Sequence, residues 1–122
     1  MNECFALLDG FFAAEIEGCR QREKALMADE RRDEAVFEKI RANVYDIFRT
    51  VLSVAVKKYA GRPQEAAEFF DAKLRGIPEG WKQAYAQALQ HNDAVRAQTE
   101  RIKTEAAEAI RRRFDELREA KQ

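Results

Sequence analysis

The sequence has little of the side-chain chemistry from which metal and catalytic sites are built. Its 122 residues include one histidine, His91, and two cysteines, Cys4 and Cys19. A di-iron bundle needs Glu-x-x-His pairs, and the residue three before the histidine is Ala88. Zinc needs three or four cysteine or histidine ligands, and two cysteines 15 residues apart on one helix lie roughly 22 Å from each other. We therefore expect no metal, no cofactor, no disulfide and no enzymatic activity.

Glycine and proline are scarce as well, with five and two residues. The glycines are scattered at positions 10, 18, 61, 76 and 80, so no glycine-rich loop is available to bind a phosphate. The only combination of nucleophile and base worth testing is Cys19 with His91. Cys19 falls on an apolar helical stripe, where a thiol stays protonated and unreactive, so we interpret it as a packed core residue.

Neither sign of charge is in excess, because 22 basic residues face 22 acidic ones and the net charge is zero. Nucleic-acid binding needs surplus lysine and arginine against phosphates, so it ranks third among the functions that we consider. The strongest basic run, Arg111-Arg112-Arg113, points in three directions on a helix. A net charge near zero also leaves little repulsion between copies of the chain, which favours self-association.

Long hydrophobic runs are absent too, and none approaches the ~20 residues that a helix needs to span a bilayer. The first 19 residues contain four acidic residues and no basic one. An export signal or a helix lying on a membrane surface carries basic residues instead. We therefore expect a cytoplasmic protein with no membrane partner.

What the chain does contain is long series of apolar residues at helical spacing. They predict an all-α fold and a single domain over residues 1–122, with helices at about 2–28, 33–59, 64–75 and 78–120. Three long helices and one short helix make an antiparallel bundle, in which the last helix is unusually long. The polar stretch from Ala28 to Asp33 predicts a tight turn. Because it holds no glycine or proline, one unbroken helix is the alternative.

The last two predicted helices depend on how glycine and proline are interpreted. Gly61 and Pro63 are expected to end the second helix, and Gly76 to end the third. Pro78 fits the first turn of the last helix. The apolar sector of residues 81–117 keeps its phase through Asn92. This favours one continuous or gently kinked helix, and a hairpin at residues 91–93 is the alternative.

The second predicted helix has one apolar stripe, which we take as the centre of its apolar face. The stripe consists of Val36, Ile40, Val44, Ile47, Val51 and Val54, and it is flanked on one side by Phe37, Phe48, Ala55 and Tyr59.

The first predicted helix has two apolar stripes, which together cover about half of its surface. It must therefore contact at least two neighbours, from its own chain or from a partner. The adjacent aromatic pairs at 11–12 and 69–70 have two interpretations: a core that wraps widely around them, or an interface that one of each pair helps to cover. The candidate interface residues are Leu7, Phe11, Ala14 and Phe70.

The leading functional hypothesis is a non-enzymatic protein-protein interaction module, an adaptor, regulator or scaffold that forms a homodimer or binds another protein. The alternative is a helical domain that holds a small apolar or amphipathic ligand between the first, second and last helices. Glu15 and His91 are the weak candidates for its polar contacts. A nucleic-acid-associated helical protein comes third.

Overall fold

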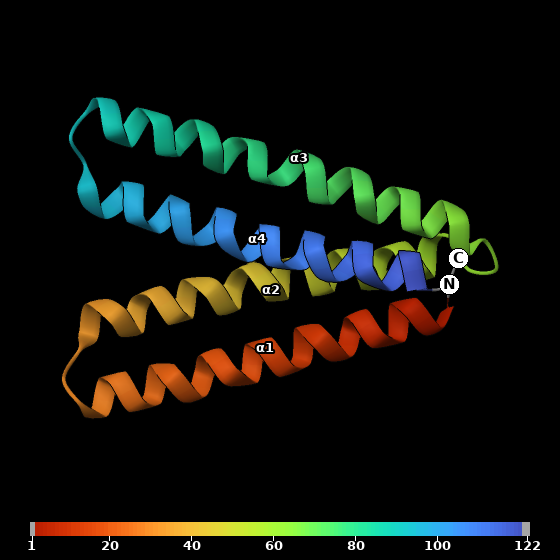
Figure 1. Cartoon of the computed structure of the whole chain (residues 1–122), viewed down its shortest axis with the longest axis horizontal. Helices are drawn as coiled ribbons and strands as arrows, with labels where there is room; N and C mark the ends of the chain where they lie inside the picture. Colours follow the sequence, from red (N-terminus) through yellow and green to blue (C-terminus); the bar gives the residue numbers. More distant parts are fainter. Residues whose placement is uncertain (1, 121–122) are drawn as a thin grey trace.

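The protein is an all-α bundle of four helices of similar length (Figure 1). The computed structural model describes residues 2–120, and its helices are α1 (Asn2–Ala28), α2 (Arg32–Lys58), α3 (Pro63–Gln90) and α4 (Ala94–Ala120). Neighbours in sequence run antiparallel, so α1 begins and α4 ends at the end of the bundle that carries the α2–α3 turn. Contacts are most extensive within the hairpins α1–α2 and α3–α4, and α2 joins the hairpins by packing on α3 and α4.

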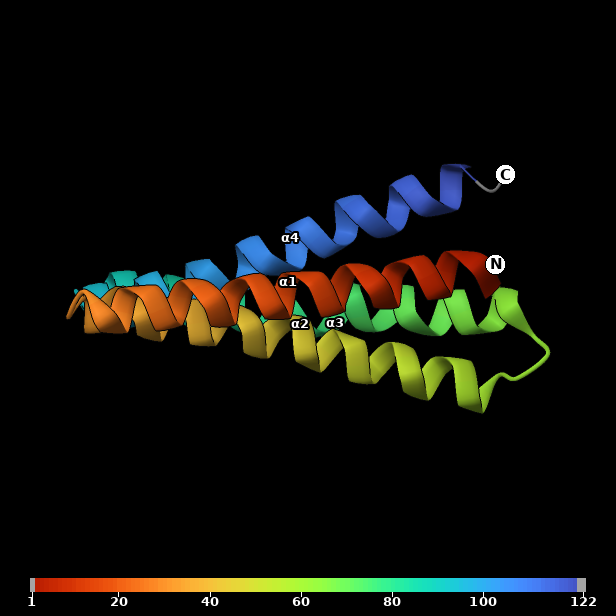
Figure 2. The same cartoon turned by 90° about the horizontal axis from the view of Figure 1, so that it is seen from below.

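The two hairpins are arranged differently at the two ends of the bundle. Toward the tight turns the hairpins separate (Figure 1). Toward the other end, α2 and α4 diverge to opposite sides of α1 (Figure 2). Large side chains fill the space between the helices there, whereas the buried residues near the tight turns are mostly alanines, at positions 35, 88 and 97.

The centre of the core is built from phenylalanines, one from each helix: Phe12, Phe48, Phe70 and Phe114. All four are fully buried. The Phe70 ring lies 4.9 Å from that of Phe114, 6.3 Å from that of Phe48 and 6.4 Å from that of Phe12, measured between centroids. Edge-on and tilted pairs at these distances are the favoured geometry for aromatic rings. Phe70 is therefore the residue at which all four helices meet.

The turn between α1 and α2 confirms the predicted break at Ala28–Asp33 and excludes an unbroken helix. Glu30 has the left-handed backbone conformation, with φ 59°. The Arg31 N–H donates to the Leu26 carbonyl at 2.9 Å, and the Glu30 N–H donates to the carbonyl of Met27. These bonds satisfy carbonyls at the end of α1 that have no partner inside the helix. The chain turns here without any glycine.

The prediction of a short third helix and a very long last helix is wrong. α3 runs through Gly76 and Pro78, although proline lacks an N–H group and costs about 3 kcal/mol inside a helix. Pro78 is buried, and the continuous helix keeps Phe70, Leu74 and Ala88 on one buried face. The burial gained along that face outweighs the lost hydrogen bond.

The alternative prediction, a hairpin at residues 91–93, is the correct one. Asn92 takes the left-handed conformation, with φ 57°, which asparagine adopts more readily than most residues. The Asp93 carboxylate then accepts a hydrogen bond from the Arg96 N–H at 3.0 Å and caps α4. The apolar sector keeps its phase across Asn92 because α3 and α4 each present an apolar face to the other. The same pattern therefore fits a helical hairpin as well as one continuous helix.

Candidate interaction surface

The four candidate interface residues lie in different environments. Leu7 is 43% exposed and Ala14 is exposed, both on α1. Phe11 is half-buried, and its ring packs edge-on against Tyr45 at 6.0 Å. Phe70 has no exposed surface, so it belongs to the core and cannot meet a partner in the folded chain. In the adjacent aromatic pair at positions 69 and 70, Phe69 is the residue that reaches the surface, and its ring centroid lies 5.7 Å from that of Tyr59.

The two candidate ligand contacts do not converge on a site. Glu15 is half-buried in α1, and His91 is exposed at the C-terminal end of α3. Neither lines the open groove that runs between the start of α1 and the end of α2. That groove has an apolar floor of Phe5, Leu52 and Val56.

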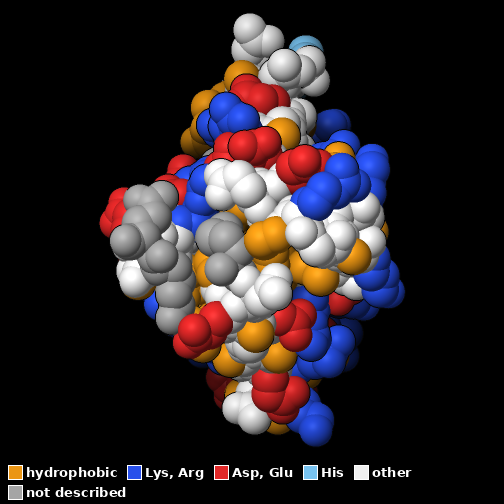
Figure 3. All heavy atoms as spheres, turned by 90° about the vertical axis from the view of Figure 1, so that its right-hand side faces the viewer, with side chains coloured by type: hydrophobic (Ala, Val, Ile, Leu, Met, Phe, Trp, Pro, Cys, Tyr) orange, Lys and Arg blue, Asp and Glu red, His pale blue; other side chains and the backbone are white. Residues whose placement is uncertain are grey.

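The end of the bundle at which α1 begins is shown in Figure 3. Hydrophobic side chains form small patches there, set among charged ones, and lysines and arginines gather along one edge. Among the described residues visible in this view, there is therefore no single large apolar face.

A row of exposed apolar side chains lies along the outer side of α2. Val36 is 52% exposed, Ile47 is 42% exposed and Val54 is 46% exposed. At 100° per residue these positions fall in one sector about 60° wide, together with two half-buried residues. We call the set the α2 stripe: Val36, Ile40, Ile47, Val51 and Val54. It runs about 27 Å along the helix.

The position of the α2 stripe corrects the predicted core face of this helix. The residues of α2 that enter the core are Ala42, Val44, Tyr45, Phe48, Leu52 and Ala55. Of the predicted stripe, only Val44 is buried. Tyr45 and Phe48 bury more area than valine or isoleucine, so the helix turns its aromatic side inward. A usable signal was present in the sequence, because polar Asn43 and Thr50 fall directly beside this sector, within about 40° of Val36 and Val54.

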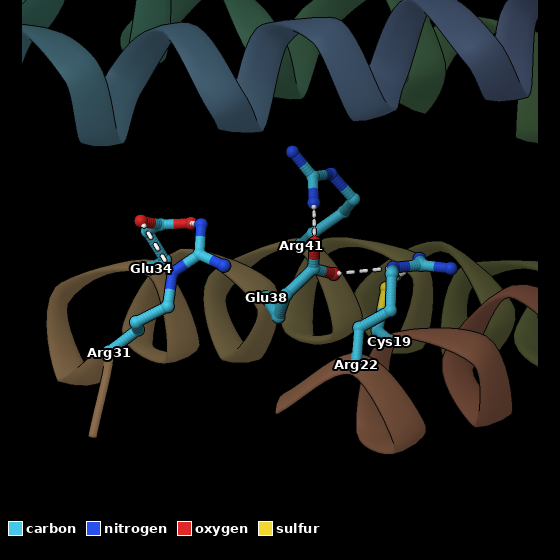
Figure 4. A network of polar contacts seen from close by, with 6 residues as sticks. All are labelled: Cys19, Arg22, Arg31, Glu34, Glu38 and Arg41. Atoms are coloured by element: carbon cyan, nitrogen blue, oxygen red, sulfur yellow. Dashed lines mark hydrogen bonds and ion pairs between the residues drawn. The ribbon is translucent and has the colours of Figure 1, made fainter. Parts of the chain in front are cut away.

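A polar cluster ties α1 to α2 on the other side of the hairpin (Figure 4). The Glu38 carboxylate accepts a hydrogen bond from Arg22 of α1 at 3.2 Å and another from Arg41 at 2.6 Å. Arg22 also donates to the Cys19 sulfur at 3.5 Å. Figure 4 shows Glu38 between the two guanidinium groups, with a separate pair of Arg31 and Glu34 at the start of α2.

The electrostatics of this cluster indicate a structural role. Burial raises the pKa of the Cys19 thiol, and the nearby Glu38 charge raises it further, so the thiol is a poor nucleophile. Burial also acts to raise the pKa of Glu38. The hydrogen bonds and charges of Arg41 and Arg22 outweigh that effect and hold the pKa below its ordinary value. An ionised carboxylate between two arginines is a clamp, with no free group to act as an acid or base.

Within residues 2–120, no three histidine, cysteine, aspartate or glutamate side chains lie together in a way that could hold a metal ion. In the same range, no helix is long and apolar enough to cross a membrane.

No protein-family model, curated protein or solved structure matches this chain. Its function therefore has to be inferred from its own surface.

Proposed function

We propose that the protein is a non-enzymatic protein-protein interaction module, an adaptor, regulator or scaffold, and that its docking surface is the α2 stripe. The observation that carries the proposal is the exposure of Val36, Ile47 and Val54 along one line of one helix. A narrow apolar line of this kind suits contact with a single partner helix.

The distribution of the other exposed apolar residues supports this choice. Met27, Leu89 and Val95 are exposed beside the two tight turns, each on a different helix. Leu7 lies near the start of α1, at the opposite end of that helix from Met27, and Val56 lies on a different side of α2 from the stripe. Scattered apolar residues are ordinary on protein surfaces, whereas an aligned set marks an interaction site.

The ligand-binding alternative has less support. The groove between α1 and α2 is apolar but open, and the predicted polar contacts lie outside it. A site for a small ligand normally encloses most of the ligand surface and fixes its orientation with converging polar groups.

Site-specific photo-crosslinking in the native cells tests the proposal. A photoreactive amino acid is placed at Ile47 or, as the matched control, at Leu7. The two residues are 42% and 43% exposed and both lie inside long helices, so they differ mainly in their surroundings. We expect position 47 to crosslink to a helical segment of another polypeptide, identified by mass spectrometry, and position 7 to give no such product. Absence of products from position 47, or equal products from both positions, would overturn the proposal.

A further inference from the structure

All residues of the α2 stripe except Val51, which packs against the core, belong to a longer series that has the spacing of a coiled-coil seam. Steps of three and four residues alternate from the first turn of α2 to its last through Asp33, Val36, Ile40, Asn43, Ile47, Thr50, Val54 and Lys57. All eight side chains are exposed, apart from the half-buried Ile40. Alternation of this kind lets the side chains of one helix fit between those of a second helix along their whole length. The occupant of the seam is therefore a helix about as long as α2 itself.

The charges at the two ends of the seam indicate what that helix is. Asp33 closes the seam at the N-terminal end of α2, and Lys57 closes it at the C-terminal end. A second copy of α2 packed parallel would place aspartate against aspartate and lysine against lysine. A second copy packed antiparallel places Asp33 against Lys57 at both ends, because a two-fold axis repeats every contact.

The rest of the seam fits the same antiparallel register. When position 33 lies opposite 57, position 36 lies opposite 54, 40 opposite 50, and 43 opposite 47. Val36 then meets Val54 of the second copy, and Ile40 meets its Thr50. Each pair joins the two kinds of seam position, which is how antiparallel helices interlock. The seam is therefore complementary to itself in sequence as well as in charge.

We propose that a second copy of this chain covers the α2 stripe, with the two α2 helices antiparallel and Asp33 of each opposite Lys57 of the other. The inference rests on the proposed function and names its partner. The chain has no net charge, so copies do not repel one another at long range. The resulting dimer has eight helices and a two-fold axis level with residue 45.

Cysteine crosslinking tests the register. Two single variants are made, Val36→Cys and Val54→Cys, and oxidised separately and as a mixture. We expect disulfide-linked dimers in the mixture and almost none from either variant alone, because each new thiol faces the other position. The native Cys4 and Cys19 are fully buried, so the oxidised wild-type chain serves as the background control. Disulfide-linked dimers from each variant alone would mean that the two α2 helices pack parallel. If the mixture gave no such dimers, the chains would associate through another surface or not at all. Either result overturns the proposal.

Charge reversal provides a second test that does not depend on thiols. Asp33→Lys places a lysine opposite Lys57 at both ends of the dimer and weakens association about tenfold. Lys57→Glu has the same effect by placing two carboxylates together. The double variant restores both attractive pairs and so restores association. The double variant also puts both charges at the unfavourable ends of the helix dipole, so a rescue cannot come from a more stable helix.

The outcomes separate this inference from the proposed function. A chain that stays monomeric at all concentrations while position 47 crosslinks to a different protein overturns the second copy and keeps the interaction module. A chain that stays monomeric and gives no product from position 47 overturns both.

Discussion

Phe70 is the residue on which the bundle depends most. Its ring touches one phenylalanine from each of the other three helices, and none of its surface is exposed. Phe70→Ala removes those contacts and leaves a cavity, and we expect it to lower the free energy of unfolding by about 3–5 kcal/mol. Chemical denaturation measures the loss. A core residue gives the same loss per chain at every protein concentration, whereas a loss seen only at high concentration would indicate an interface residue instead.

The Glu38 carboxylate makes the stability of the protein depend on pH. Its pKa is held below the ordinary value of 4.5, so its ionised form stabilises the folded state. This contribution is complete above about pH 4.5 and is lost as the pH falls through the lowered pKa of the folded state. We expect Glu38→Gln to be less stable than the wild type at pH 7 and to lose less stability between pH 5 and pH 3.

Urea unfolding at a series of pH values measures this difference. Glu108→Gln changes an exposed glutamate of α4 and is the matched control. If the two variants gave identical profiles between pH 7 and pH 3, the clamp at Glu38 would contribute nothing.

Element boundaries show which sequence signals are reliable in this chain. The bounds of α1 were predicted correctly and those of α2 to within one residue, because a run of polar residues separates two strong apolar patterns. The start of α3 was predicted to within one residue and the end of α4 correctly, but the end of α3 and the start of α4 were wrong, because Gly76 and Pro78 are stronger local signals than Asn92 and Asp93. The burial of a whole helix face overrides such a local signal. How much area is buried depends on the neighbouring helices, so it cannot be estimated from the local sequence.

The α1–α2 turn offers a direct gain in stability. Glu30 holds the left-handed conformation at φ 59°, where its side chain crowds the backbone and where glycine does not. We expect Glu30→Gly to raise the free energy of unfolding by about 1 kcal/mol despite the greater freedom of the unfolded chain. Asn92→Gly is the comparison, because asparagine tolerates this conformation and has less to gain. Thermal unfolding ranks the two variants, and a Glu30→Gly protein less stable than the wild type would contradict the geometry of the turn.

At the scale of the molecule, the all-α class and the antiparallel arrangement could be predicted from the spacing of apolar residues. Which side of α2 faces the core could be predicted only in part. Polar Asn43 and Thr50 mark an exposed sector, but apolar residues cover more than half of that helix and the partner helices decide which of them are buried. The same excess of apolar residues leaves the α2 stripe exposed. Of the candidate interface residues, Phe70 of α3 is a core residue, while Leu7 and Ala14 of α1 lie at the surface.

The mass of the protein in solution, measured by light scattering on a sizing column over a range of concentrations, tests the central claim most directly. The wild-type chain is compared with Ile47→Glu on the α2 stripe and with Leu7→Glu on α1. The account predicts twice the mass of one chain for the wild type and for Leu7→Glu, and the mass of one chain, with its helical signal retained, for Ile47→Glu. A wild type with the mass of one chain at every concentration, or a dimer that Leu7→Glu dissociates and Ile47→Glu does not, would contradict it.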